Sequence, residues 1–386
     1  MVVTLTILHY HLRPGGITTV VRNAQRALSK KFDVRLLAGF GYDEKPARNR
    51  ALFEADARAL MKRLPRTGIL HTHNVSLGKN PRLAYAVKLL AQQTSIRIIN
   101  QIHDFPEDNR PAELRALRYC TGKRDDRFWR EFCYYDLPNV IWATLTTHDA
   151  TRLAERGIPA RKIHVLPNPV DDTEFSGSVS PRAETLTTLT QYARQHHFLF
   201  DPRRPILLSP MKVMVRKNNE EAIELVKRLK NYQLVISLDA SSPSDRAYSE
   251  RLKRKIRRER LPVAIGAGKA FADPLPLFDI ACAVLTTSKV EGFGYAFLEG
   301  WLRRKLVFGR DIPEVTRDFV AAGMDFRHLY HELDDSTIQR IAKLLAHQPR
   351  ALIEKNRRVV LAHYSLRAYA RRYNEILRRC LLGSFD

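Results

Sequence analysis

Residues 2–28 read VVTLTILHYHLRPGGITTVVRNAQRAL and predict one parallel α/β unit. The apolar run at residues 2–8 predicts a strand, and Arg13-Pro14-Gly15-Gly16 predicts a loop. Beyond the loop, apolar residues recur at the spacing of one helix face. They are Ile17, Val20, Val21, Ala24 and Leu28. Strand, loop and helix in this order indicate the repeating unit of a parallel sheet.

The same alternation continues along the chain and predicts two sets of strands. The first set is expected at residues 34–38, 68–71, 97–101 and 140–145, and the second at 205–209, 233–238, 263–267 and 280–285. The 386 residues are about two to three times a typical domain. We therefore predict domains at 1–170 and 205–365, an interdomain connection at 171–204, and a final helix at 366–386.

The net charge is strongly positive and points to an anionic partner. The chain has 65 Lys and Arg against 41 Asp and Glu, a formal charge of +24. Nucleic acid, acidic lipid and nucleotide phosphate all fit this charge. Residues 246–260 hold eight basic residues and two glutamates, which fits a solvated helix face or a patch for anionic lipid. No nucleic-acid-binding motif accompanies them, so nucleic acid is the weaker expectation.

The cysteines and the apolar runs indicate a reduced protein that does not span a membrane. Cys120, Cys133, Cys282 and Cys380 are too few and too scattered for a disulfide framework, and no Cys-x-x-Cys pair suggests zinc. The apolar start lacks the basic segment of a signal peptide, and no run approaches about 18 apolar residues. We expect a cytoplasmic location, with any membrane contact peripheral at the inner face.

Residues 291–299, EGFGYAFLE, are the most informative motif of the second half. The two glycines let the backbone approach a ligand closely, and a helix that begins near Gly294 would direct free N–H groups to the same point. A phosphate fits that position. Glu291 and Glu299 could then meet different hydroxyl groups of one extended ligand. The structural alternative is a capped helix with two solvated glutamates.

Residues 209–218, SPMKVMVRKN, form a second candidate at an expected strand-to-helix junction. Lys212, Arg216 and Lys217 there suit a diphosphate, although a solvated basic loop is the alternative. Gly15-Gly16 makes a third loop compatible with an anion. The chain contains neither a dinucleotide-binding glycine fingerprint nor a P-loop.

Two histidine-containing segments each follow an expected strand of the first half: His71-Thr72-His73-Asn74 and His103-Asp104-Phe105-Pro106. Neither has the i, i+4 pair of a zinc-binding helix. A hydrogen-bonded structural histidine is the default for each of them, and we predict no metal site.

These motifs together carry a resemblance that spans almost the full chain. In order they are Arg13 to Ile17, His71 to Asn74, Gln101 to Asp104, Leu166 to Val170, Lys212 with Arg216 to Asn218, and Glu291 to Gly294 with Glu299. The chain resembles a retaining glycosyltransferase of the GT-B fold, similar to glycosyltransferase family 4. The resemblance implies two Rossmann-like domains that face each other across a cleft, with the C-terminal helix returning to the first domain.

The resemblance also implies roles for the residues of the second domain, which would bind the donor. Glu291 resembles the glutamate that contacts the donor sugar, and Glu299 the one that holds the ribose hydroxyls. Lys212 and Lys217 resemble the paired cations on the diphosphate, with Arg216 as a third. The rest of the implied donor-binding set is Gly16, Gly292, Phe293, Gly294 and Tyr295.

In the first domain, which would bind the acceptor, His103 resembles the histidine near the transferred sugar. The catalytic set would therefore be Glu291, His103 and Lys217, and we expect His73 and Asp104 to contact the acceptor. The chain departs from the family at Lys212, where arginine is more common, so its phosphate contact would be monodentate.

The implied reaction is metal-independent transfer of a hexose from a UDP-sugar or GDP-sugar, with retention, to a glycan or lipid acceptor. No cofactor is implied beyond this co-substrate. Two alternatives stay open: a nucleotide-sugar epimerase or synthase of the same fold, and a basic protein that binds nucleic acid or membrane on an inactive GT-B scaffold.

Overall fold

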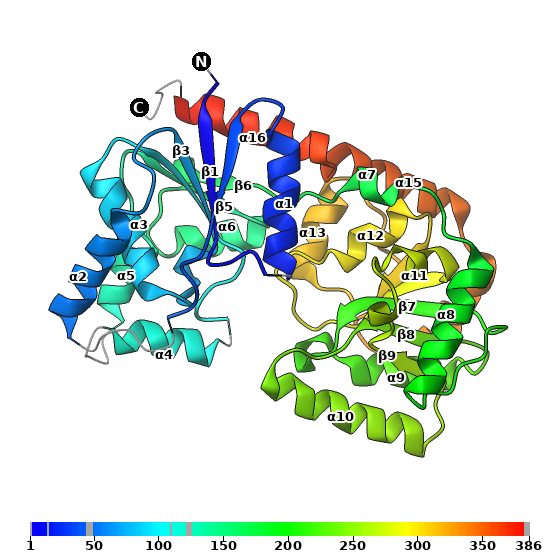
Figure 1. Ribbon diagram of the computed structural model, residues 1–386. Helices are drawn as coiled ribbons and strands as arrows, with labels where there is room; N and C mark the ends of the chain where they lie inside the picture. The colour runs from blue at the N-terminus through cyan, green and yellow to red at the C-terminus, as the bar shows by residue number, and fades with distance from the viewer. Residues whose placement is uncertain (1, 14, 44–48, 109, 121–125, 382–386) are drawn as a thin grey trace. The chain divides into compact units, whose positions relative to one another are not determined.

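The computed structural model describes residues 2–13, 15–43, 49–108, 110–120 and 126–381. These residues form two compact units, described one at a time below (Figure 1). Unit 1 comprises the described residues of 1–169 and 364–386, and unit 2 comprises residues 170–363. Each unit is built on one wholly parallel sheet.

Unit 1 has a six-stranded sheet in the order β2-β1-β3-β4-β5-β6. Its strands are β1 (Thr4–Leu8), β2 (Asp33–Leu37), β3 (Ile69–His73), β4 (Arg97–Gln101), β5 (Val140–Thr144) and β6 (Ile163–Val165). Its helices are α1 (Gly16–Leu28), α2 (Arg50–Met61), α3 (Pro81–Gln93), α4 (Pro111–Tyr119), α5 (Arg127–Cys133), α6 (Thr147–Ala154) and α16 (Leu366–Leu381), with 3-10 turns η1 (Val75–Leu77) and η2 (Ala160–Lys162).

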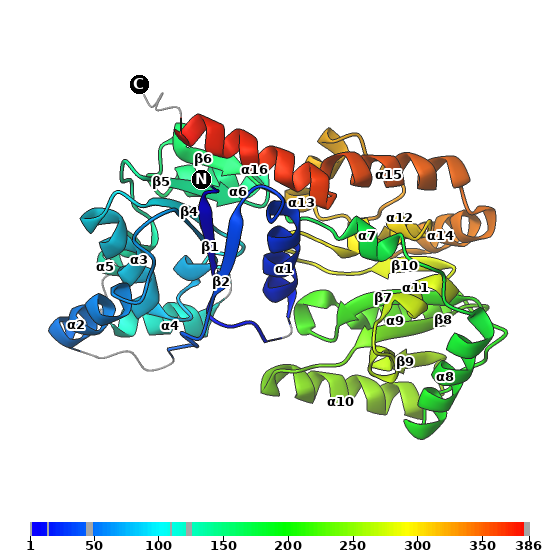
Figure 2. The same cartoon turned by 45° about the horizontal axis from the view of Figure 1, so that its top comes forward.

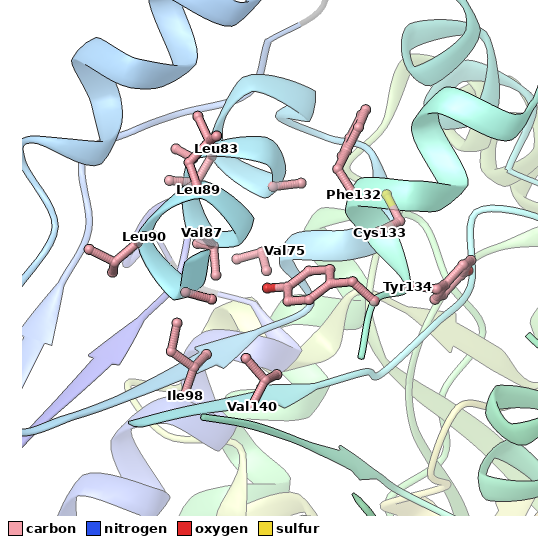
Figure 3. Packing of buried hydrophobic residues seen from close by; sticks show 14 of the residues in the cluster. Val75, Leu83, Val87, Leu89, Leu90, Ile98, Phe132, Cys133, Tyr134 and Val140 are labelled. Carbon is pink, nitrogen blue, oxygen red and sulfur yellow. The ribbon is translucent and has the colours of Figure 1, made fainter. Parts of the chain in front are cut away.

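Helices cover both faces of this sheet, so its inner strands, such as β3 and β5, are buried on both sides, whereas the edge strands β2 and β6 are partly exposed. On one face α3 and α5 pack over β4 and β5, with Leu83, Val87 and Phe132 among the buried side chains (Figure 3). On the other face the C-terminal α16 lies beside α1 (Figure 2). Its Tyr369 and Tyr373, four residues apart, belong to the same buried cluster as the apolar face of α1.

Unit 2 has a five-stranded sheet in the order β11-β10-β7-β8-β9. Its strands are β7 (Ile206–Lys212), β8 (Gln233–Leu238), β9 (Val263–Ile265), β10 (Ala283–Thr286) and β11 (Leu306–Gly309). Its helices are α7 (Asp172–Phe175), α8 (Arg182–Gln195), α9 (Asn219–Arg228), α10 (Pro243–Arg258), α11 (Leu275–Ile280), α12 (Ala296–Leu302), α13 (Pro313–Ala321), α14 (Asp335–His347) and α15 (Arg350–His363), with 3-10 turns η3 (Val215–Lys217) and η4 (Ala267–Ala270).

The prediction that residues 171–204 form an interdomain connection is wrong. They belong to unit 2, where α8 packs against α11. Leu189 is fully buried, and the hydroxyl of Tyr192 donates to the carbonyl of Ile265 at 2.8 Å. The segment contains α8, whose few buried residues pack it onto unit 2. Residues 382–386 of the expected last helix lie outside the described residues.

Several strand boundaries also differ from the expected ones. Ile280 is the last residue of α11, and the strand begins at Ala283, because a buried helix and a buried strand follow each other in one apolar run. β3 extends through His73 and β7 through Lys212. His71, His73 and Lys212 therefore lie within strands, whereas His103 follows β4 as expected.

The thiols of Cys120 and Cys133 are free and buried, and that of Cys282 is free and partly buried. The side chain of Cys380 lies outside the described part of the structure. In the described residues, no helix combines the length and the apolar character that a membrane crossing requires.

The basic segment at 246–260 lies mostly in α10, which is amphipathic. Tyr248, Leu252 and Ile256 are buried along one side of the helix. On the other side Arg251 pairs with Glu220 at 3.0 Å, and the segment is otherwise rich in exposed arginine. An exposed basic side fits both expectations for this segment, a solvated helix face and a patch for anionic lipid.

The order of the strands places a reversal point in each sheet. In unit 1 the chain moves outward from β1 in both directions, to β2 and to β3, and in unit 2 it does so from β7, to β8 and to β10. Loops that leave adjacent strands at such a point run to opposite faces of the sheet. The crevice at the carboxyl ends of those strands is where open α/β sheets bind their ligands.

The backbone of β11 approaches β10 so closely that only glycine fits at its end. Gly309 has a φ of 149°, and a Cβ there would lie 1.8 Å from the carbonyl oxygen of Thr286. We expect Gly309→Ala to lower the free energy of unfolding by more than about 2 kcal/mol, measured by urea unfolding. Gly16→Ala is the control, because a Cβ at Gly16 meets no atom within 4 Å. Equal midpoints for the two variants would contradict this geometry.

Candidate active site

The loops that follow β7 and β10 are held together by backbone hydrogen bonds at the reversal point of unit 2. The amide of Lys289 donates to the carbonyl of Arg216 at 3.0 Å. The hydroxyl of Thr287 donates to the carbonyls of Lys217 and Asn218 at 3.0 and 3.1 Å. Two segments more than sixty-five residues apart are thereby fixed against each other at one edge of the sheet.

The same two loops bring a carboxylate and two cations together. The ammonium of Lys217 contacts Oε1 of Glu291, and Nη1 of Arg216 lies 3.5 Å from Oε2. Nη1 of Arg216 also donates to the carbonyl of Val290 at 3.0 Å. The side chains of Lys217 and Glu291 are only 12% and 8% exposed. Three residues singled out in the sequence therefore form one cluster.

This cluster holds Glu291 in its charged form. Burial by itself would raise the pKa of the carboxyl, but the charges of Lys217 and Arg216 and hydrogen bonds from Lys217 and Ser288 together lower that pKa below its ordinary value. Two cations thus contact the same carboxylate, and Arg216 is the more exposed of the two. Guanidinium and ammonium groups fixed in this way are also the donors that bind phosphate oxygens.

Glu299 lies in the first turn of α12, close enough to feel the charge of Lys217. Burial raises the pKa of Glu299 to about 7, with a further contribution from the carboxylate of Glu174 in α7, while Lys217 opposes the shift. Near neutral pH this carboxyl is therefore partly protonated. It can donate as well as accept a hydrogen bond.

Lys212, the third predicted cation, has a separate partner. Its ammonium donates to the hydroxyl of Ser241, beyond the end of β8, at 2.9 Å. Both residues lie at the carboxyl edge of the same sheet as Lys217. The structure thus assembles Arg216 and Lys217 around Glu291, whereas the side chain of Lys212, at the end of the same strand β7, pairs with the loop after β8.

The glycine-containing motif is built partly for packing. Gly294 has a φ of 85°, and a Cβ there would lie 2.8 Å from the ring of Phe297. Phe293 is buried, with its ring edge-on to Phe319 at a centroid distance of 5.7 Å, so its side chain belongs to the core of unit 2. Tyr295 and Gly292 are partly exposed. α12 begins at Ala296, two residues later than expected.

Gly16 is the first residue of α1 in unit 1. The first turn of α1 has no acidic residue, and the N-cap Gly15 provides no side-chain cap. A Cβ at Gly16 meets nothing within 4 Å, so the described fold itself does not require glycine there. Pro14 of the same motif lies outside the described residues.

The histidines of unit 1 form a buried network across β3 and β4. Nδ1 of His73 lies 3.0 Å from Nε2 of His103, and Nε2 of His71 lies 3.0 Å from Oε1 of Gln101. The amide nitrogen of Gln101 donates to the carbonyl of Leu166, so its oxygen is the acceptor and Nε2 of His71 carries a proton. Burial lowers the pKa of His71 and of His103 to about 3. These rings are neutral at physiological pH.

The expected acceptor residues differ in accessibility. His73 is fully buried, whereas His103 is 5% exposed and Asp104 is partly exposed. Asp104 pairs with Arg110 at 2.7 Å. His73 therefore has no surface to offer a ligand in this structure, and its contact is with His103.

The side chain of Asn74 fixes the backbone of the loop that follows β4. Its sequence motif predicted no such role. Asn74 has a φ of 60°, and its Oδ1 accepts from the backbone amides of His103 and Asp104 at 3.1 and 3.2 Å. The residue type could have indicated this turn, because asparagine adopts left-handed backbone conformations more readily than most residues.

A second network supports Lys217 and is not visible in the sequence. Asn218, with a φ of 52°, donates from its side chain to Glu221 at 2.8 Å. Glu221 also accepts from the hydroxyl of Tyr330 at 2.9 Å and from Nε of Arg310 at 3.2 Å. Arg310 follows β11, so three strand ends contribute to the placement of the loop that carries Lys217.

No group of three or more His, Cys, Asp or Glu side chains within the described ranges is arranged to hold a metal ion.

Solved structures with a similar architecture include a glycosyltransferase and a sugar-phosphate synthase. A glycosyltransferase from Rickettsia africae matches with TM-score 0.70 and 16% identity, over 99% of this chain and 100% of that chain. Sucrose-phosphate synthase from Thermosynechococcus elongatus matches with TM-score 0.68 and 14% identity, over 99% of this chain and 100% of that chain. Anabaena HepE in complex with UDP and glucose matches with TM-score 0.67 and 12% identity, over 97% of this chain and 99% of that chain. The chain has the GT-B fold, and that expectation is confirmed.

A curated protein is similar in sequence. Mannosylglucosyl-3-phosphoglycerate synthase from Petrotoga mobilis is 25% identical over 346 residues, which cover 82% of this chain. The match spans 66% of that protein, just under two thirds of its length. No protein-family model matches the chain.

We expect Glu174→Gln to lower the pKa of Glu299 from about 7, because it removes the neighbouring negative charge. A ¹³C NMR titration of labelled glutamate measures this directly. Since the raised pKa lets the folded state hold the proton more tightly, the contribution of Glu299 to stability declines as pH rises from about 4.5 through about 7. That decline becomes smaller in Glu174→Gln. Glu184→Gln, at an exposed position of α8, is the control, and an equal shift in both variants would contradict the assignment.

Proposed function

We propose that this protein is a retaining glycosyltransferase that moves a hexose from a nucleoside diphosphate sugar to an acceptor. The main support is the Arg216, Lys217 and Glu291 cluster at the reversal point of a parallel sheet in a GT-B fold. The name of the curated relative and the UDP and glucose in the HepE complex add support.

In this proposal unit 2 binds the donor and stabilises the departing diphosphate. Negative charge builds on the leaving phosphate oxygens as the glycosidic bond breaks. Lys217 and Arg216 are already fixed by Glu291 and by the backbone, so little reorganisation is needed when that charge develops. Lys212, held near the end of β8, supplies a further cation at the same edge. These cations provide the positive charge that a metal ion provides in other transferases.

The remaining donor contacts follow from the loop between β10 and α12. Glu299 can hold the two ribose hydroxyls, since its carboxyl titrates near neutral pH and can both donate and accept. Both oxygens of Glu291 face cations, Oε1 at Lys217 and Oε2 at Arg216, and in this proposal the carboxylate also accepts a hydrogen bond from a hydroxyl of the donor sugar. Gly292 and Gly294 offer backbone N–H groups, and Tyr295 offers a partly exposed ring.

In unit 1, His103 is the residue we assign to the transferred sugar. Nε2 of His103 is hydrogen-bonded to Nδ1 of His73, so Nδ1 of His103 is the ring nitrogen that we assign to the ligand. His73 then acts as a positioning residue, because the shared proton between the two rings decides whether Nδ1 of His103 donates or accepts. Gly16 would let the backbone of α1 approach a phosphate, which fits the open space around it.

The acceptor in this proposal carries a hydroxyl that attacks on the same face that the diphosphate leaves, giving retention. A glycan, a lipid-linked sugar and a small phosphorylated acid all fit the reaction. The relative from Petrotoga mobilis is named for a product with a 3-phosphoglycerate group, which brings phosphorylated acids into this range. A binding protein on an inactive scaffold is less well supported, since the glutamate and the cations are all in place.

We expect Lys217→Ala to lower turnover at least ~100-fold with the fold intact, because it removes a preorganised cation from the leaving group. A thermal-shift panel of UDP, GDP and their sugars first identifies the donor, which stabilises the native state. Turnover is then measured at saturating donor, with circular dichroism as the check on folding. Lys230→Ala, an exposed lysine of the same unit, is the control. Near-normal turnover in Lys217→Ala would refute the assignment.

A further inference from the structure

A cluster of hydrogen-bond donors lies where three loops of unit 1 meet. These loops follow the carboxyl ends of β1, β2 and β3 and contain His11, Tyr42 and Lys79. The hydroxyl of Tyr42 lies 2.7 Å from Nε2 of His11 and 3.3 Å from Nζ of Lys79. Nζ of Lys79 also lies 4.7 Å from the centroid of the Tyr42 ring. One exposed tyrosine therefore joins a histidine and a lysine.

The backbone fixes this arrangement. The amide of Asp43 donates to the carbonyl of Lys79 at 2.7 Å, and the amide of Gly41 donates to the carbonyl of Tyr10 at 3.0 Å. Tyr10 is fully buried, and its hydroxyl donates to the carbonyls of Asn74 and Val75. The three loops are thus tied to one another independently of the exposed side chains.

The cluster carries positive charge that the described residues do not neutralise. Burial lowers the pKa of His11, and the charges of Arg13 and Lys79 lower it further, so both cations lie near this ring. Within the described ranges neither Arg13 nor Lys79 forms an ion pair with a carboxylate. Two acidic side chains of the described loop residues have other partners, Asp43 with Arg82 and Asp104 with Arg110.

One polar atom of the cluster has no partner. Nδ1 of His11 is buried and makes no hydrogen bond in the described structure. The groups gathered here are a guanidinium, an ammonium and a phenol, which are the donors that bind phosphate or carboxylate. A site for an uncharged sugar would instead be expected to contain carboxylate or amide acceptors for the sugar hydroxyls.

We propose that Arg13, Lys79 and Tyr42 bind an acidic group of the acceptor, so that this enzyme glycosylates an anionic molecule. The proposal rests on the proposed glycosyl transfer and adds the acceptor class and the residues that select it. A soluble phosphorylated or carboxylated acid and an acidic lipid headgroup share the required chemistry, and the experiment separates these two sources.

Acceptors are compared in pairs that differ in the acidic group, with the donor identified by thermal shift. The pairs are 3-phosphoglycerate with glycerol, glucose 6-phosphate with glucose, and phosphatidylglycerol vesicles with phosphatidylcholine vesicles. We expect at least one acidic member to be used with kcat/KM at least ~10-fold above its neutral partner, since charge-assisted hydrogen bonds are lost in the neutral one. Use of the soluble acids identifies a soluble acceptor, and use of the vesicles alone identifies a lipid.

Lys79→Met and Arg13→Met keep an unbranched, flexible side chain and remove the charge. Each should raise KM for the acidic acceptor at least ~10-fold while the affinity for the donor nucleotide stays unchanged. Arg22→Met, at an exposed position of α1, is the control and should change neither value. Equal use of the acidic and neutral members, or an unchanged KM in both variants, would overturn the proposal while leaving glycosyl transfer intact.

Calorimetry of 3-phosphoglycerate and glucose 6-phosphate without donor gives a test that does not depend on transfer. Binding of either acid that is lost in Lys79→Met supports the site. If the wild-type protein binds no nucleotide sugar and transfers to no acceptor, the proposed function fails. If it transfers and neither acid nor acidic vesicle binds through Lys79, only the present inference fails.

Discussion

The ion pair between Lys217 and Glu291 depends on the parallel pairing of β7 and β10. The two residues are 74 positions apart in the chain, and only adjacency of their strands brings their loops to one edge. Because both side chains are buried, they must stay in contact: an unpaired charge at the same depth would be strongly unfavourable. Arg216 adds a second cation beside the same carboxylate, and its more exposed guanidinium can contact an anionic ligand.

The two units carry different groups at the carboxyl ends of similar parallel sheets, charged groups in unit 2 and neutral histidines in unit 1. Unit 2 keeps charged groups at the reversal point of its sheet and stabilises them with one another and with the network of Glu221, Tyr330 and Arg310. Unit 1 buries neutral histidines at the corresponding point, where desolvation holds the pKa of His103 far below its ordinary value. The first arrangement suits a diphosphate, and the second suits hydrogen bonding to uncharged hydroxyls.

The spacing of apolar residues predicted the correct boundaries for elements whose apolar run is flanked by polar residues on both sides. β4 and β8 have the predicted boundaries for this reason. It failed where apolar elements adjoin, as at α11 and β10, and where a strand is very short, as in β6 and β11. Glu291, Lys217 and Arg216 could be placed together because carboxyl ends of parallel strands converge. The burial of Phe293 and the effect of Glu174 on Glu299 arise from tertiary contacts that no local pattern encodes.

A crystal structure with a bound nucleoside diphosphate tests the central claim most directly. The account predicts that the diphosphate lies within hydrogen-bond distance of Nζ of Lys217 and beside Arg216, with the ribose hydroxyls at Glu299. A nucleotide bound with its phosphates away from the loops that follow β7 and β10, while the Lys217 and Glu291 pair stays untouched, would contradict it.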